Sequence, residues 1–268
     1  MAAEVRIRVM VLVDEFPKTP ETFIVDHVAG LIRSGFDVVV VTRKADKPRF
    51  RALVGEIADH VTFETFFSGH RKSLIDKYRE MASLKRWPRL VANKGARKLA
   101  ARAARLRAKI AAVEPDVVHA HFGPMGVSAA LAIGGGFVPL LIDFHGYDTT
   151  RFPAKYGWRL YRCVFGRLRC VRAIVHSPFT CDILERHLNL DLAYVNYGVD
   201  TSLFLSGDKG ATWPDCVRLL SVGRLVELKG HNVAIEALMT LTTAMPNVTF
   251  ELTVVGDGEA REIGRAHV

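Results

Sequence analysis

Cysteine is scarce in this sequence, and its spacing excludes the usual cysteine-based sites. The 268 residues include only Cys163, Cys170, Cys181 and Cys216. No two of them have the C-x-x-C spacing of a zinc or dithiol site. We therefore expect reduced thiols, no metal ligation and a cytoplasmic protein, since reducing compartments keep thiols unpaired.

Acidic residues are absent between Glu80 and Glu114, whereas ten lysines and arginines fall between Lys85 and Lys109. This stretch contributes to a formal net charge of +9. Trp87 is the only aromatic residue in the run, which argues against a base-stacking platform, so we expect no nucleic-acid partner. We expect a largely helical surface segment, which is either a solvated helix face or a contact with anionic lipid at the inner face of the plasma membrane.

An uninterrupted hydrophobic run of membrane-spanning character is also missing. Residues 9–13 are too short for a signal peptide and are followed by Asp14 and Glu15. Residues 122–142 carry no charge over a length that would cross a bilayer, but Gly134 opens a run of three glycines inside them. We expect a buried helix, a glycine loop and a buried strand in this segment.

The sequence is rich in short apolar, valine-containing runs that alternate with helical patterns. Residues 38–41 are four consecutive valines, which indicates a strand buried on both faces of a parallel sheet. The expected strands cover residues 6–13, 37–42, 116–120, 140–144 and 173–175, and the expected helices cover residues 22–34, 125–133 and 179–187. This βαβ repetition predicts an α/β fold with a doubly wound sheet.

A change of composition divides the chain. Residues 206–216 are polar and contain glycine and proline, which is typical of a linker. We therefore expect a first domain at residues 1–205 and the start of a second at 217–268, with a strand at 217–222, a helix at 231–245 and a strand at 249–255. One βαβ unit leaves a sheet face and edge uncovered, so we expect the second domain to be incomplete.

Ligands of an open α/β sheet bind at the carboxyl ends of its strands, and His145 and Gly146 follow the strand expected at 140–144. His145 is either a core histidine or a residue of the cleft, and its place at a strand end favours the cleft. We expect His119 in the core, because it alternates with Ala120 along its strand. His121 and Gly123 are expected to line the cleft.

A second candidate site follows the strand at 217–222. Gly223 allows a ligand to approach the backbone closely, and Arg224 and Lys229 bring two cations to a loop that opens a helix. A helix N-terminus adds its own positive end, so the loop suits a diphosphate. An ordinary loop with solvated charges is equally compatible with these residues alone.

Together these motifs resemble the group 1, glycogen-synthase-like retaining glycosyltransferases of GT-B fold. Residues 222–230 and 255–258 resemble the family's donor-domain signature. Residues 115–121 resemble its PDVVHAH strand. His145 and Gly146 resemble its catalytic histidine turn. Residues 196–200, together with Phe204, resemble the segment in which the family's chain crosses from the first domain to the second. The opening EFP…ETFI, residues 15–24, resembles the branch that builds colanic acid and other exopolysaccharides.

The resemblance implies two Rossmann-like domains and a hexosyltransferase that moves a sugar from a UDP- or GDP-sugar to a lipid-linked cell-surface glycan. It implies retention of configuration, with the leaving phosphate helping to deprotonate the acceptor, and no cofactor besides this co-substrate. His145 would be catalytic. Acceptor-side substrate binding would fall to Phe16, Glu21, Thr22, His121, Gly123, Gly146 and Ser177. The donor phosphates would be bound by Gly223, Arg224 and Lys229, with Gly256, Asp257 and Gly258 near the nucleotide.

One family feature is missing. The glutamate pair that holds the donor ribose and sugar belongs beyond Gly258, and Glu259 is part of the preceding loop rather than a substitute. We therefore expect this chain to be an inactive fragment of such an enzyme. Residues 262–268 also resemble translated sequencing adapter.

Two other function classes compete. A dinucleotide-dependent oxidoreductase needs G-x-G-x-x-G after a strand, but Gly256 and Gly258 lack the third glycine and no glycine follows the first strand directly. A binding module would act through the basic stretch, on anionic membrane rather than on nucleic acid. Titration with UDP- and GDP-sugars, NAD and single-stranded DNA distinguishes the three classes.

Overall fold

The computed structural model describes residues 6–66, 94–134, 136–199, 201, 202, 204 and 216–261, without the side chains of residues 94–101. The chain forms two compact units, Met1–Val199 and Asp200–Val268. Each unit is described by itself.

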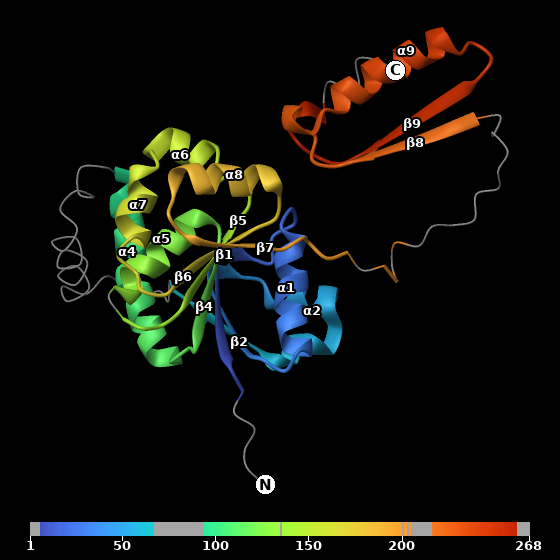
Figure 1. Ribbon diagram of the computed structural model, residues 1–268. Coiled ribbons are helices and arrows are strands. Elements are labelled where there is room, and N and C mark those ends of the chain that lie inside the picture. The colour runs from blue at the N-terminus through green and yellow to red at the C-terminus, as the bar shows by residue number, and fades with distance from the viewer. Residues whose placement is uncertain are drawn as a thin grey trace. The chain divides into compact units, whose positions relative to one another are not determined.

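The first unit is built on a seven-stranded parallel sheet (Figure 1). Its strands are β1 (Arg8–Phe16), β2 (Asp37–Ala45), β3 (Val61–Thr65), β4 (Val117–His121), β5 (Leu140–Phe144), β6 (Val171–Val175) and β7 (Asp191–Tyr194). They lie in the order β3-β2-β1-β4-β5-β6-β7. The order reverses direction between β1 and β4, which makes this the switch point of a doubly wound sheet.

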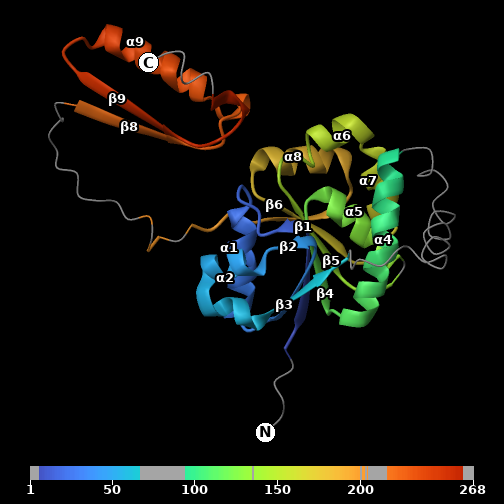
Figure 2. The ribbon, with the colours of Figure 1, turned by 180° about the vertical axis from the view of Figure 1, so that it is seen from behind.

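Helices cover both faces of this sheet (Figures 1 and 2). On one side lie α1 (Thr22–Arg33), α2 (Lys47–Val54) and a 3-10 turn (Gly55–His60). On the other side, α5 (Gly123–Ile133) packs against β1, β4 and β5 and is covered by α4 (Lys94–Val113) and α7 (Arg159–Phe165). The remaining helices are α6 (Arg151–Tyr156) and α8 (Pro178–His187), and α8 packs on β6 and β7.

The alternation of side chains along β1 explains the two-sided core. Val9, Val11 and Val13 are buried with α1 and α2 in one apolar cluster. Met10 and Leu12 are buried with α5 in the other cluster. The central strands are therefore apolar on both faces, as the valine runs predicted.

The elements expected in the first domain are all present, with shifted bounds for several. β5 has the predicted bounds, whereas β1 begins later and extends to Phe16, so that the segment expected after the strand belongs to it. Residues 122–142 form α5, a loop and β5, as predicted. Within the described ranges, no helix combines the length and apolar character needed to span a membrane.

The basic stretch is described only from residue 94 onward, where it forms α4; residues 85–93 lie outside the described residues. Arg107 donates hydrogen bonds to the carbonyl oxygens of Leu131 and Ala132 at the end of α5. Lys109 pairs with Glu64 at 2.6 Å. These two cations bind within the protein, as does Arg102, which pairs with Asp14 at 2.9 Å. These three residues therefore do not support the expected contact with anionic lipid, which stays a prediction for the other basic residues of the stretch.

The second unit contains one βαβ element, as expected. β8 (Cys216–Val222) and β9 (Thr249–Val255) pair in parallel, and α9 (His231–Ala244) connects them after a 3-10 turn (Glu227–Lys229). Residues 205–215, which include most of the expected linker, lie outside the described residues.

Candidate functional site

Four histidines surround the buried side chain of Asp143 at the carboxyl ends of neighbouring strands. His119 and His121 lie on β4, His145 follows β5 and His176 follows β6. The parallel register places His121 directly beside Asp143. Because the carboxyl ends of parallel strands meet at one edge, residues far apart in the sequence converge there.

Asp143 is the centre of this cluster. Its Oδ1 atom lies 2.6 Å from His176 Nε2. Its Oδ2 atom lies 3.2 Å from His121 Nδ1, 3.5 Å from His119 Nε2 and 3.9 Å from His145 Nε2. Burial alone would raise the pKa of Asp143, but the surrounding histidines hold it far below its ordinary value. Asp143 is therefore an ionised carboxylate in the interior.

His176 carries the balancing positive charge. Its Nδ1 atom faces the carbonyl oxygen of Val195 at 2.7 Å, and its Nε2 atom faces Asp143. Both partners are acceptors, so both ring nitrogens donate and the ring is an imidazolium. Burial lowers the pKa of His176, but the hydrogen bond to Asp143 outweighs burial and the net shift is upward.

Burial keeps His27, His121 and His145 neutral. Burial lowers the pKa of His145 to about 3 and that of His27, on α1, to about 2. Burial also lowers the pKa of His121. His27 Nδ1 lies 3.0 Å from His121 Nε2, so a hydrogen-bonded path runs from α1 through His121 to Asp143.

The rings form a stack that ends at Tyr197. His145 is nearly parallel to His121 and to His176, with ring centroids 5.5 and 5.4 Å away. The Tyr197 ring stacks on His176 at 3.9 Å, and its hydroxyl forms a short hydrogen bond with His145 Nδ1. Phe23 also contacts the His145 ring, with centroids 4.7 Å apart. Only 5% of the His145 side chain is exposed.

Asp148 fixes the backbone of the His145 turn. Its carboxylate accepts hydrogen bonds from the N–H groups of His145 and Gly123, each at 2.8 Å. Gly146 has a φ of 78°, which lets the chain turn between His145 and Asp148 without the strain a side chain would cause. Tyr161 donates its hydroxyl to the Asp148 carbonyl oxygen at 3.0 Å. The turn is thus held to the start of α5.

Three residues predicted to bind substrate lie in the interior instead. Phe16 is 1% exposed and packs on Phe50 and Phe63, so it belongs to the core. His121 is fully buried beneath His145 and does not line an open surface. Gly123 is also buried, and its N–H is bound to Asp148. These residues support the site rather than line it.

Of the other predicted acceptor-side residues, Ser177 is the N-cap of α8, where its hydroxyl accepts from the Thr180 N–H at 3.2 Å. Thr22 is exposed as the first residue of α1. Glu21 is half-buried and pairs with Lys18 at 2.6 Å. In the described part of the chain, none of the three forms a hydrogen bond or a ring contact with the His145 side chain.

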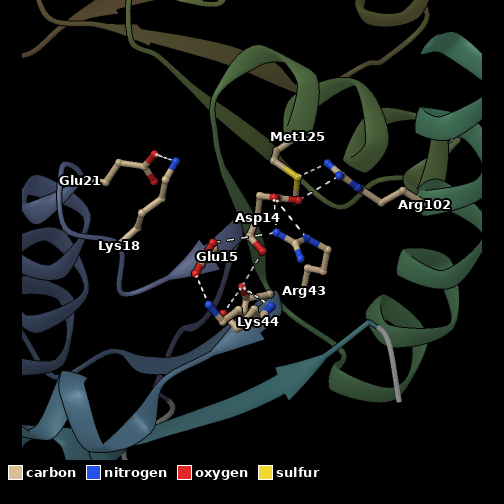
Figure 3. Close-up of polar contacts among 9 residues, drawn as sticks. Asp14, Glu15, Lys18, Glu21, Arg43, Lys44, Arg102 and Met125 are labelled. Atoms are coloured by element: carbon tan, nitrogen blue, oxygen red, sulfur yellow. Dashed lines mark hydrogen bonds and ion pairs between the residues drawn. The ribbon is translucent and has the colours of Figure 1, made fainter. Parts of the chain in front are cut away.

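The acids at the end of β1 are paired with cations (Figure 3). Asp14 receives hydrogen bonds from Arg102 at 2.9 Å and from Arg43 at 3.2 Å. Glu15 is bonded to Lys44 at 2.7 Å. Arg102 also reaches the sulfur of Met125, on α5, at 2.8 Å. The network ties α4 to the sheet beside the site.

In the second unit, the predicted phosphate loop joins β8 to α9. Arg224 and Lys229 are both exposed on this loop. His231 opens α9, contacts the Ser221 hydroxyl at 2.9 Å and lies 3.2 Å from the Arg224 carbonyl oxygen. His231, for which the motifs predicted no role, therefore anchors the loop that presents both cations.

Gly256 and Gly258 allow the loops after β8 and β9 to pack together. A Cβ atom on Gly256 would lie 1.8 Å from the Gly223 carbonyl oxygen, and one on Gly258 would lie 2.4 Å from that of Leu225. The Leu225 N–H donates to the Asp257 carbonyl oxygen at 2.9 Å. Close backbone packing thus accounts for these glycines, whether or not a nucleotide lies near them.

Comparison with known proteins supplies a family and a fold. Residues 20–203 match the family described as Glycosyltransferase Family 4. No curated protein matches the chain.

Solved structures of low sequence identity share the fold. A glycosyltransferase from Rickettsia africae is 16% identical with a TM-score of 0.62, and the match covers 97% of this chain and 63% of that protein. Anabaena Alr3699/HepE in complex with UDP-glucose is 16% identical with a TM-score of 0.64, and the match covers 98% of this chain and 65% of HepE. The lipopolysaccharide outer core galactosyltransferase WaaB, in its apo form, is 13% identical with a TM-score of 0.61, and the match covers 97% of this chain and 64% of WaaB. The chain thus spans a little under two thirds of each, and its α/β architecture is that of these GT-B proteins.

Proposed function

The chain belongs to Glycosyltransferase Family 4, and from this premise we propose that it transfers a hexose from a nucleotide-sugar donor to a glycan, with retention of configuration. The observation that carries the proposal is the site around His145. A neutral histidine lies at the carboxyl end of a central strand, with its backbone fixed by Asp148 and a buried carboxylate beneath it.

The protonation state of His145 suits contact with a sugar. With its pKa lowered to about 3, the ring is neutral near pH 7 and offers one donor and one acceptor nitrogen. Its Nδ1 atom already binds the Tyr197 hydroxyl, which shows that this edge accommodates an O–H group. We infer that a hydroxyl of the donor sugar takes the place of this phenol, so Tyr197 moves when the donor binds.

The charges beneath His145 support the reaction electrostatically. Glycosyl transfer develops positive charge on the sugar in the transition state. The ionised Asp143 lies 3.9 Å from His145 Nε2 and favours the tautomer that donates from this nitrogen. The Nδ1 atom is then the acceptor toward the sugar. Preorganised groups of this kind act strongly because the site is shielded from water.

The leaving diphosphate is assigned to the second unit. Arg224 and Lys229 lie on the loop before α9, where a helix N-terminus that has no side-chain cap and two cations suit phosphate oxygens. We extend this assignment to a UDP- or GDP-hexose, since HepE, which shares the fold, was solved with UDP-glucose.

The acceptor is proposed to be a lipid-linked, cell-surface polysaccharide. The support is the sequence resemblance to exopolysaccharide enzymes and the shared fold with WaaB, a lipopolysaccharide outer core galactosyltransferase by its description. A nicotinamide-dependent reaction is not favoured, because the family match is to glycosyltransferases.

The test is incubation of the enzyme with UDP- and GDP-hexoses and a lipid-linked glycan extract. We expect nucleoside diphosphate release that depends on the extract, a result that would also overturn the sequence-based expectation of an inactive fragment, and NMR of the product should show the anomeric configuration of the donor. Inversion of configuration would contradict the retaining mechanism. Binding of NAD with no binding of any nucleotide sugar would contradict the whole proposal.

A further inference from the structure

We propose that His119, His121 and Asp143 form a buried binding site for a divalent transition-metal ion, with Zn²⁺ as the best match. The ligand set is two imidazoles and one carboxylate, which is a common zinc chemistry. The three ligand atoms all lie within 4.8 Å of one another. Cysteine spacing predicted no metal site, whereas this triad depends on a His-x-His strand whose register places a carboxylate beside it.

The distances already approach those of a metal site. His121 Nδ1 and His119 Nε2 lie 3.2 and 3.5 Å from the same oxygen, Asp143 Oδ2. With metal–ligand bonds of about 2.0–2.1 Å, neighbouring ligands of a tetrahedral zinc ion lie about 3.3 Å apart. Two of the three ligand pairs are therefore already at the spacing that a tetrahedral ion requires.

An unsatisfied nitrogen points independently to a ligand. In the described part of the chain, His119 Nε2 is the one buried side-chain nitrogen or oxygen without a hydrogen-bond partner. The His119 side chain is 8% exposed. Most buried polar groups are hydrogen-bonded, and an exception calls for a specific explanation. A metal ion bound to Nε2 would satisfy this nitrogen.

Residues around the triad orient its ligands. His27 Nδ1 contacts His121 Nε2, so His121 can donate from Nε2 while Nδ1 binds the ion. His176 Nε2 holds the other carboxylate oxygen, Asp143 Oδ1, at 2.6 Å. Metal-bound histidines and carboxylates usually have such outer hydrogen-bond partners. The cluster thus has three candidate ligands and, around them, hydrogen-bond partners that orient those ligands.

A second triad, Asp143, His145 and His176, is also close enough to bind an ion, but His176 is a poor ligand. Both of its nitrogens donate, to Val195 and to Asp143, so neither offers a lone pair. His145 Nε2 lies 3.3 Å from His121 Nδ1, but in the ring whose Nδ1 accepts from Tyr197 this nitrogen carries the proton and offers no lone pair either.

Isothermal titration of chelator-treated protein with ZnCl₂ tests the proposal. We expect about one Zn²⁺ per chain and, with Co²⁺, the visible absorption of a tetrahedral complex. His119→Gln should weaken Zn²⁺ binding by about 100-fold or more. His187→Gln is the matched control, because His187 stacks on Trp158 rather than in the cluster, and it should bind as the parent does. Equal affinity of the His119→Gln and parent proteins would overturn the site.

A measurement on the parent protein removes the dependence on variants that fold poorly. In ¹⁵N NMR, Zn²⁺ should shift the resonances of His119 Nε2 and His121 Nδ1 and leave those of the exposed His60 unchanged. Shifts confined to His60 and His187, or no shift at one equivalent of Zn²⁺, would contradict the assignment. This result does not depend on the proposed glycosyltransferase activity.

Discussion

The backbone N–H of His145 donates a hydrogen bond to Asp148 Oδ1 at 2.8 Å, and this contact fixes the turn on which the proposed reaction depends. The other oxygen of Asp148 holds the Gly123 N–H at the start of α5. One buried carboxylate therefore joins the turn after β5 to the helix that follows β4.

Replacement of Asp148 by Asn should destabilise the first unit. An amide oxygen satisfies one of the two N–H donors, while the amide nitrogen faces the other and leaves it unpaired. We expect a loss of about 1–3 kcal/mol in the free energy of unfolding by urea. The measurement belongs at about pH 7.5, above the value of about 6 to which burial raises the pKa of Asp148. Asp182→Asn, at an exposed position of α8, should change stability little.

The long valine runs made the central strands predictable, but shorter elements left no comparable signal. β7 is four residues long and has no buried residue, and β3 is half-buried. Phe16 was wrongly predicted to line the substrate site because β3 and α2, which cover it, had not been predicted. Its aromatic partners lie on α2 and β3, and without those elements the residue after a buried run was expected in a loop.

The site was predictable where one residue follows one strand, as His145 does. The cluster as a whole was not, because it depends on register and helix rotation. Asp143 lies inside a strand and meets His121 only through the β4–β5 pairing. His27 reaches the site because α1 turns it toward the sheet. No sequence spacing encodes either contact.

Stability should fall at acid pH partly through His27. Its pKa is about 2 in the folded protein and 6.5 in its ordinary state, so the unfolded chain binds a proton between these values and the folded chain does not. As the pH is lowered through this range, the free energy of unfolding therefore decreases by about 1.4 kcal/mol per pH unit. Between about pH 6 and pH 4, His27→Gln should reduce the slope of the free energy of unfolding against pH by this amount. His60→Gln, at an exposed position, should leave the slope unchanged.

Gly123 is expected to tolerate no side chain. A Cβ atom there would lie 2.3 Å from the Tyr161 hydroxyl oxygen and 3.0 Å from Phe144 Cε1. Gly123→Ala should therefore cost about 1–3 kcal/mol through overpacking, measured by urea unfolding. Gly198→Ala has open space around the new carbon and should be nearly neutral. Equal stability of the two variants would show that the helix start is not held as described.

Lys229 should contribute to the affinity for a nucleoside diphosphate. A charge-assisted contact is worth about 1.5–3 kcal/mol, so Lys229→Ala should weaken UDP or GDP binding in calorimetry by about tenfold or more. Arg218→Ala removes a cation near the other end of β8, where Arg218 lies 3.6 Å from Glu251, and should bind as the parent does. An equal loss in both variants would indicate a general charge effect instead of a phosphate site.

The rate of sugar transfer by the enzyme carrying His145→Gln tests the central claim most directly. The replacement keeps a polar side chain of similar reach and removes the imidazole, while the backbone hydrogen bond from residue 145 to Asp148 stays available. We predict that the initial rate with a saturating nucleotide sugar falls about 100-fold or more, while urea unfolding stays close to that of the parent and His187→Gln transfers at the parent rate. A folded His145→Gln enzyme that transfers sugar at the parent rate would contradict the assignment of the reaction to this site.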